Sequence, residues 1–550
     1  MRRIPLLAAV LLALPLRAQD RTAEVDRIFA FATAESPGCA VGASQRGRTL
    51  VSRGYGLADL GKRTPIGERA RFDIGSTQKQ FTAAAILLLV EDGRLALADD
   101  VRKHLPELPD YGRPVTIDHL LTHTAGIRDW TGLLPMAPEG TDVLALVLRQ
   151  RGLTAPPGEA WSYSSSGFEL AKAIVARASG TSFAEFARKR LFAPLGMTAT
   201  AYVPDVLQAG PDAALGYQKD GAAWTPYMRL GANRGGGAIV STVGDLLRWQ
   251  DALADGKLGA SVTAKLHEPA RLRNGRTLSY ARGLIVESNR GRRMVWHSGG
   301  AAGFSTLMAR FPEHALSVVV ACNFDPVSAT ALGARVADLF LPPPGEQPAR
   351  AAVGGVDVGP RAGLYLDERT GEPLRLAVNG GRLGVANGPP LVPTSATEFR
   401  PPRPDLSFRS QDDFTLTFAD ADRFEIRSME GEVTRYRRAR PWTPAAAELA
   451  ALDGRYESPE LGSVFHVVAG DGRITLRSER DAARAVELEP LERDAFIRSL
   501  MTVRFRRDAG GKVVGFDYGN PLVRGIAFTR LGDRAAGATA AAPAPDASNA

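Results

Sequence analysis

The amino-acid sequence predicts an α+β domain built on one antiparallel sheet, followed by two small all-β domains. Strand-like runs open and close the segment 20–341, and helix-like stretches lie between them. Strands at both ends of one segment favour a single sheet assembled from distant pieces of chain. A proline-rich linker at 341–345 follows, and beyond it short alternating strands and glycine turns replace almost all helix signal.

The elements of the first domain follow from local patterns. Strands are predicted over 39–44 and 48–56, joined by a short turn at 45–47. The stretch 80–93 is apolar almost all round and ends at Gly93, so we expect a helix inside the protein. The remaining expectations are helices over 117–123, 167–178, 182–191 and 244–254, then the strand-like runs STLMARF and LSVVVACN.

The C-terminal part contains a repeat. GLYLDERTG at 363–371 recurs as GRYESPELG at 454–462, and GRL at 381–383 recurs as GRI at 472–474 with the same offset. A repeat of about 90 residues predicts two small β-barrels or sandwiches side by side. The expected boundaries are a catalytic domain over 20–341, barrels over 357–441 and 449–533, and a disordered low-complexity tail over 534–550.

Composition and the N-terminus bear on partners and compartment. The net charge of +8 comes from scattered arginines without an aromatic-interleaved basic stripe, which argues against nucleic-acid binding. Arg2 and Arg3 precede an apolar stretch at 4–16 that is too short to span a bilayer. We therefore expect a signal peptide at 1–18 and a periplasmic or secreted protein with no stable membrane insertion after cleavage.

Ser76 and Lys79 form the Ser-x-x-Lys motif of the chain. Gly75 and Ser76 open the apolar helix, which places the serine at the positive end of the helix dipole, where an oxyanion is favoured. A spacing of three puts Lys79 on the same face, one turn deeper, as a base toward the hydroxyl. The alternative interpretation is an N-cap serine followed by a surface lysine.

Two further stretches carry candidate site residues. The loop PGEAWSYSSSGF at 157–168 places Tyr163 ahead of a helix, where it points a phenol into a cleft or simply caps the helix. The stretch WHSGG at 296–300 precedes a strand and resembles a glycine-rich edge that lets a substrate approach the backbone. A lone histidine such as His297 is otherwise structural.

In this order and spacing the three stretches resemble the signatures of the β-lactamase and penicillin-binding serine hydrolases. The turn LLTHTAGI at 120–127 is also typical of that family. With the repeated β region, the arrangement is most similar to the bacterial D-aminopeptidases. The resemblance implies a β-lactamase/penicillin-recognising transpeptidase-like domain, two eight-stranded β-barrels, no cofactor, and a small-molecule or peptide substrate.

The resemblance also implies roles for individual residues. Ser76 attacks a carbonyl and forms an acyl-enzyme, while Lys79 and Tyr163 carry the proton from the serine to the leaving group. The backbone N–H groups of Ser76 and Gly300 form the oxyanion hole. His297 polarises the site and contacts substrate or Tyr163. The remaining substrate-binding candidates are Ser165, Ser298 and Gly299.

Three departures from the family pattern bear on the substrate. Ser165 stands where the family has the asparagine of Tyr-x-Asn, and His297 replaces a lysine. Both changes favour D-aminopeptidase, amidase or esterase chemistry over β-lactamase or DD-peptidase action. The stretch 496–505, which corresponds to an active-site loop of the D-aminopeptidases, is shortened and has no acidic residue. A non-catalytic penicillin-sensing or ligand-binding protein is the alternative of another class.

Two smaller predictions complete the sequence reading. His119 and His123 are spaced as two metal ligands on a helix could be. No glutamate follows His119 as it does in zincins, so no metal site is expected. In the fold that the chain resembles, the strands of Cys39 and Cys322 are antiparallel neighbours. The cysteines are thus expected close together, either bonded or as two buried thiols.

Overall fold

The computed structural model describes residues 21–228, 237–343, 351–386, 388–402, 414–428, 431–481 and 485–532. The predicted signal peptide and C-terminal tail lie outside the described residues. Within these ranges no helix has both the length and the apolar character needed to cross a membrane.

One antiparallel sheet of six strands forms the centre of the first domain. Its order is β10-β11-β12-β13-β1-β2, so the N-terminal hairpin pairs with a strand from the far end of the domain. The predicted sheet of distant pieces is therefore confirmed. The strands are β1 (Cys39–Gln45), β2 (Arg48–Tyr55), β10 (Ile285–Asn289), β11 (Arg292–Ala301), β12 (Phe304–Phe311) and β13 (Leu316–Cys322).

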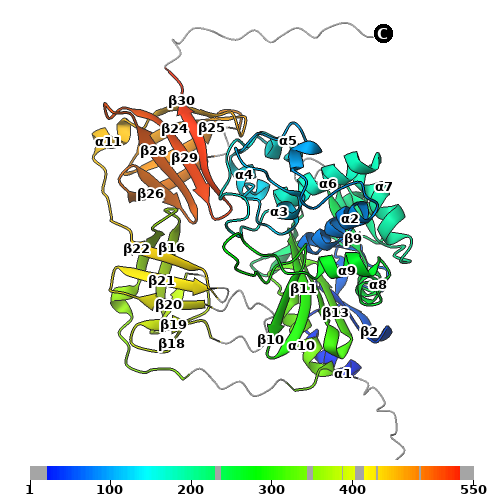
Figure 1. Cartoon of the computed structure of the whole chain (residues 1–550). Coiled ribbons are helices and arrows are strands. Elements are labelled where there is room, and N and C mark those ends of the chain that lie inside the picture. The colour runs from blue at the N-terminus through cyan, green and yellow to red at the C-terminus, as the bar shows by residue number, and fades with distance from the viewer. Residues whose placement is uncertain are drawn as a thin grey trace, which may run out of the picture.

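Helices cover both faces of this sheet (Figure 1). On β13, Val318 and Val320 belong to the core under α1 (Thr22–Ile28) and α10 (Ala329–Phe340). Val319, between them, faces the opposite core. Burial on both faces explains why this strand reads as an uninterrupted apolar run. The other helices are α2 (Lys79–Glu91), α3 (Ile117–Leu121), α4 (Trp130–Leu133), α5 (Val143–Leu148), α6 (Ser165–Ser179), α7 (Phe183–Ala187), α8 (Val243–Ala254) and α9 (Ala260–Leu266).

Three helix predictions need correction. The segment Gly75–Gln78 is a 3-10 turn, so α2 begins at Lys79 rather than at the serine. Helix α3 ends at Leu121 because His123 adopts a left-handed φ of 59°. Helix α7 ends at Ala187 and continues as a π-helical turn. Short strands complete the domain: β3 (Leu57–Asp59), β4 (Thr64–Pro65), β5 (Phe72–Asp73), β6 (Ala201–Val203), β7 (Tyr217–Asp220), β8 (Ala223–Pro226), β9 (Ala238–Ser241) and β14 (Phe324–Asp325).

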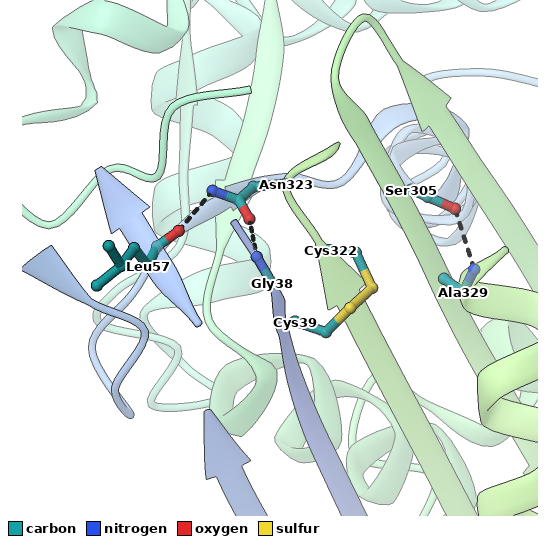
Figure 2. Close-up of a disulfide and its surroundings, with 7 residues drawn as sticks. All are labelled: Gly38, Cys39, Leu57, Ser305, Cys322, Asn323 and Ala329. Carbon is teal, nitrogen blue, oxygen red and sulfur yellow. Dashed lines mark hydrogen bonds between the residues drawn. A yellow bond between two sulfur atoms is a disulfide. The ribbon is translucent and has the colours of Figure 1, made fainter. Parts of the chain in front are cut away.

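Cys39 and Cys322 lie directly opposite each other on β1 and β13 and form a disulfide (Figure 2). The expected strand pairing is confirmed, and of the two states that the sequence left open the structure has the bond. Beside it, the buried side chain of Asn323 accepts from the Gly38 N–H at 2.8 Å and donates to the Leu57 carbonyl at 3.0 Å. The start of β1 is thus held to the end of β13 by a covalent link and by a fully engaged amide.

Both predicted barrels are present. The first is a near-closed sheet of eight strands: β15 (Gly363–Asp367), β16 (Pro373–Asn379), β17 (Arg382–Val385), β18 (Val392–Pro393), β19 (Glu398–Arg400), β20 (Phe414–Phe418), β21 (Arg423–Ser428) and β22 (Val433–Arg438). After α11 (Ala446–Ala450) the second barrel is closed: β23 (Gly454–Ser458), β24 (Ser463–Gly470), β25 (Arg473–Ser478), β26 (Ala485–Glu492), β27 (Ala495–Arg498), β28 (Met501–Arg507), β29 (Val513–Asn520) and β30 (Val523–Arg530).

The second barrel docks onto the catalytic domain beside α4 and α5 (Figure 1). Leu133, Met136 and Leu146 of that domain belong to the hydrophobic core of the barrel. Across the same interface Arg128 pairs with Glu460 at 2.9 Å, and both side chains are nearly buried. The apolar core therefore continues from one domain into the other.

Candidate active site

Ser76 is held by a close approach between its turn and strand β11. A Cβ on Gly299 would lie 2.0 Å from the carbonyl oxygen of Ile74, and one on Gly75 would lie 2.7 Å from the nitrogen of Gly300. Gly75 also has a φ of 52°, which L side chains rarely adopt. These glycines serve the contact between two backbone segments, and that contact brings the serine beside Gly300.

Lys79 lies where it can exchange a proton with the serine. Its Nζ donates to Ser76 Oγ at 3.1 Å and to Ser165 Oγ at 3.4 Å. The same ammonium lies 4.8 Å from the centre of the Tyr163 ring and 5.5 Å from that of Phe168. Only 4% of the lysine is exposed. A serine and a lysine from one stretch and a tyrosine from another thus meet at one point.

Hydrogen bonds to the segment 129–131 hold the loop that carries Tyr163. The Ser165 N–H donates to the carboxylate of Asp129, which also accepts from the Thr131 N–H at 2.7 Å. In return, Ser166 Oγ accepts from the Trp130 N–H at 2.8 Å. Because Asp129 is buried and its oxygens are engaged, its function here is to position the loop.

A chain of hydrogen bonds joins this loop to β11. The Ser164 N–H donates to His123 Nδ1 at 3.0 Å, which leaves the proton of that ring on Nε2. His123 Nε2 is 3.0 Å from Tyr280 Oη, and His297 Nε2 is 3.1 Å from the same oxygen. His297 Nδ1 lies 2.6 Å from the Ser298 carbonyl oxygen and must carry a proton to donate to it. The donors therefore run one way, from the Tyr163 loop through Tyr280 to the glycine-rich edge.

The two histidines in this series of hydrogen bonds, His123 and His297, are neutral at pH 7. Burial, assisted by the charge of Lys79, lowers the pKa of His297 to about 3. Burial and the same lysine lower the pKa of His123 well below its ordinary value. Burial also raises the pKa of Tyr280 well above that of a free phenol. His297 thus brings no positive charge to the site, and both of its ring nitrogens are engaged.

A second cluster of ionisable side chains lies on α6 and β6. Lys172 pairs with Glu169 at 2.9 Å and its Nζ is 3.3 Å from Tyr202 Oη. Burial raises the pKa of Glu169. Burial acts to lower the pKa of Lys172, but the nearby Glu169 and Tyr202 raise it overall. Glu169 and Lys172, which form this pair, both line the same cavity as Ser76.

The cavity has a volume of about 340 Å³ and gathers most of the predicted site residues. Ser76, Lys79, Tyr163, Ser165 and Gly300 line it. His297, Ser298 and Gly299 precede Gly300 on the same strand, β11, and are not among the described residues that line the cavity. The catalytic roles of all these residues stay predictions.

Sequence reasoning missed several residues of this site. Tyr280 and Lys172 belong to no recognised motif, and the sequence gives no local signal for either. Asp129 lies in the stretch 126–130, which drew attention only through its resemblance to the D-aminopeptidases. Leu522, from the turn between β29 and β30 of the second barrel, also lines the cavity. Nothing in the repeat marks that turn as part of a site.

With the serine, lysine and tyrosine in one cavity, the comparison with known families is decisive. A family model described as Beta-lactamase matches residues 25–340. The chain belongs to the β-lactamase family. This family is one of hydrolases, and the sequence-based resemblance to it is confirmed.

The proteins that resemble this chain carry different names. Penicillin-binding protein 4* of Bacillus subtilis (strain 168) is 31% identical over 306 residues, covering 51% of this chain and 67% of that protein. The D-aminopeptidase of Brucella canis (strain ATCC 23365 / NCTC 10854 / RM-666) is 26% identical over 523 residues, covering 90% of this chain and 96% of the relative. The octameric penicillin-binding protein homologue from Pyrococcus abyssi superposes with a TM-score of 0.52 at 21% identity, over 84% of this chain and 98% of that one. That likeness concerns the fold.

Proposed function

We propose that this β-lactamase-family protein is an exported serine acyl hydrolase that acts on a small amide or ester through an acyl-enzyme on Ser76. The observation that carries the proposal is the hydrogen bond of 3.1 Å from Lys79 Nζ to Ser76 Oγ inside the cavity. A buried lysine in contact with a serine hydroxyl is the arrangement that activates a nucleophile.

The reaction proceeds in two steps. Ser76 Oγ bonds to the substrate carbonyl carbon while its proton passes to the Lys79–Tyr163 pair. The N–H groups of Ser76 and Gly300 stabilise the oxyanion. The bond to the leaving amine or alcohol then breaks, and that group takes up the proton. Water, deprotonated by the same pair, attacks the ester carbonyl, releases the acid and restores the serine hydroxyl.

The preference for D-aminoacyl amides, simple amides or esters rests on two observations. The similarity to the Brucella D-aminopeptidase spans the catalytic domain and both barrels. In addition, His297 is held neutral, so it supplies no fixed positive charge for the carboxylate of a penicillin or a peptide C-terminus.

The first experiment is a substrate screen with matched variants. D-aminoacyl p-nitroanilides, short-chain p-nitrophenyl esters and nitrocefin are compared on the full chain. Ser76→Ala should abolish turnover and labelling by a fluorescent phosphonate, whereas full activity in this variant contradicts the mechanism. Lys79→Ala should slow acylation by about 10²–10⁴-fold. A non-catalytic sensor would instead acylate once and stop.

β-Lactamase or DD-peptidase action is the second candidate, favoured by the 31% identity to penicillin-binding protein 4*. Ser165 tests it directly, because its hydroxyl lies beside Lys79 at the position of the family's asparagine. Ser165→Asn should raise amide or β-lactam hydrolysis relative to ester hydrolysis. If the amide-to-ester ratio stays unchanged, this position does not set specificity.

Export is part of the proposal. Disulfides persist in oxidising compartments, and Cys39 and Cys322 are bonded in the structure, which supports a periplasmic or secreted location. N-terminal sequencing of the protein recovered from the periplasm or the medium should find the chain cleaved near Ala18. A full-length protein retained in the cytoplasm would contradict this.

A further inference from the structure

The turn between β29 and β30 places an apolar side chain in the wall of the substrate cavity. Leu522 lines the same cavity as Ser76 and Lys79, although it belongs to the second barrel. The residue is 36% exposed, which places it among the exposed large apolar residues of the described part of the chain. An apolar group left open to a cavity beside a nucleophile is available to a ligand.

Hydrogen bonds across the domain boundary fix this turn in place. Asn520 Nδ2 and Tyr518 Oη both donate to the carbonyl oxygen of Gly132, each at 2.9 Å. The other atom of the same amide, Asn520 Oδ1, accepts from the N–H of Leu522 at 2.9 Å and from that of Val523 at 3.2 Å. One asparagine therefore holds the turn in shape and ties it to the catalytic domain.

Gly132 allows the barrel to approach this closely. A Cβ at that position would lie 2.9 Å from Asn520 Oδ1, 2.9 Å from Leu522 Cβ and 3.0 Å from Val523 Cγ1. A Cβ essentially never lies closer than 3.0 Å to such atoms in proteins, so any larger residue at this position would displace the turn. The anchor around it is extensive, since Arg128 also donates to the Gly525 carbonyl oxygen at 2.8 Å. Leu522 is thus preorganised rather than free to retract.

An aromatic side chain of the catalytic domain lines the same cavity. Trp130 precedes Gly132, the neighbour of Leu522, by two residues, and Asp129 before it already accepts hydrogen bonds from Thr131 and Ser165. A substrate group placed here meets the isobutyl group of Leu522 and an indole instead of an unpaired charge. The stretch 496–505, which the sequence predicts to be shortened, is a hairpin in which a tight turn of Ser499 and Leu500 joins β27 and β28.

We infer that Leu522 and Trp130 form a subsite that binds an apolar group of the substrate, so that the second barrel determines specificity. The inference rests on the proposed hydrolase function and narrows it to substrates with an alkyl or aryl substituent near the scissile carbonyl. Such a subsite discriminates between substrates by their apolar contact area. Each substrate methylene that contacts an apolar side chain stabilises the transition state further.

The test compares two esters on a set of matched variants. For p-nitrophenyl hexanoate and p-nitrophenyl acetate, the ratio of kcat/KM values measures the gain from the alkyl chain. Leu522→Ala should lower this hexanoate-to-acetate ratio by about 10-fold relative to the wild type. Leu522→Met, which keeps an apolar side chain of similar size, should retain most of the wild-type ratio. The control is Leu500→Ala, which truncates a half-exposed leucine on a turn of the same barrel and should keep the ratio of the wild type.

The outcomes separate the subsite from the hydrolase function. If the wild type hydrolyses both esters and a phosphonate labels Ser76, but the ratio for Leu522→Ala equals that for Leu500→Ala, the subsite is wrong and the hydrolase function stands. A wild type that neither turns over an ester nor labels at Ser76 overturns both. Gly132→Ala, which displaces the turn from outside the cavity, should lower the same ratio with Leu522 intact.

Discussion

The two barrels arise from one repeated unit, yet they relate to the active site differently. Each begins with a buried tyrosine whose hydroxyl donates to the carbonyl four residues earlier: Tyr365 to Arg361 at 3.0 Å and Tyr456 to Leu452 at 2.7 Å. Each tyrosine ring is also covered by an arginine near the end of the unit, 4.7 Å away in the first barrel and 5.8 Å in the second.

Beyond this shared unit, the described residues of the second barrel share a hydrophobic core with the catalytic domain, and those of the first barrel do not. It takes Leu133 into its core and sends Leu522 into the cavity, whereas no described residue of the first barrel lines that cavity. The first barrel contacts the catalytic domain through the pair Arg276–Glu432, in which the carboxylate is 43% exposed. Internal contacts thus preserve the repeat, and the docked surface decides the role of each copy.

Removal of the disulfide should have the largest effect and should show which parts unfold together. The bond closes a loop with a sequence separation of 283, so the double variant Cys39→Ala/Cys322→Ala should lose about 5–6 kcal/mol of stability on the chain-entropy model. If the second barrel is continuous with the catalytic domain, hydrogen exchange should rise in both and stay unchanged in the first barrel. A rise in exchange confined to the catalytic domain would mean that the second barrel does not unfold together with it.

Two arginines test the docking surfaces directly. Arg128→Ala leaves the carboxylate of Glu460 buried without its partner and should cost about 3–5 kcal/mol. Arg276→Ala removes the half-exposed pair with Glu432 and should cost at most about 1 kcal/mol. Denaturant midpoints of the two variants provide the measurement. Equal losses would mean that the two barrels are docked equally.

Mild acid should weaken the catalytic domain and leave the first barrel unchanged. His297 has a pKa of about 3 when folded and an ordinary value of 6.5, so below pH 6.5 the unfolded state takes up the proton first. Its stabilising contribution is complete above pH 6.5 and falls by about 2 kcal/mol at pH 5. No histidine occurs in the segment 357–441.

Tryptophan fluorescence during denaturation at pH 7 and pH 5 measures this shift, because five of the six tryptophans precede residue 342. Hydrogen exchange of the first barrel at the same two pH values is the control. A catalytic domain equally stable at both would mean that His297 is not held neutral.

The smallest expected effect concerns the shared tyrosines. Tyr456→Phe removes one buried hydrogen bond, to the Leu452 carbonyl, whereas Tyr365→Phe removes partly buried ones to the carbonyls of Arg361 and Ala421 and from Arg438. Each substitution should cost on the order of 1 kcal/mol in its own barrel. Because the second barrel shares its core with the catalytic domain, Tyr456→Phe should also lower the midpoint of that domain. A shift of the same size from Tyr365→Phe would erase the distinction between the barrels.

The sequence by itself determined the fold class and the neighbourhood of Ser76. Alternating and uniformly apolar runs have periods of a few residues, so β1, β13 and α2 were recognisable without any tertiary contact. The repeat predicted two barrels because its offset is constant. Ser76 and Lys79 were found together because they are separated by one helical turn, which fixes their relation locally.

Only the tertiary structure decided which distant residues complete the site. Tyr280 joins two histidines that stand far apart in the chain, and Leu522 reaches the cavity through a turn with no pattern of its own. The sequence also left the bond between Cys39 and Cys322 open, and it placed the start of α2 one 3-10 turn too early. Such contacts depend on how separate elements pack against one another, and local periodicity carries no information about that packing.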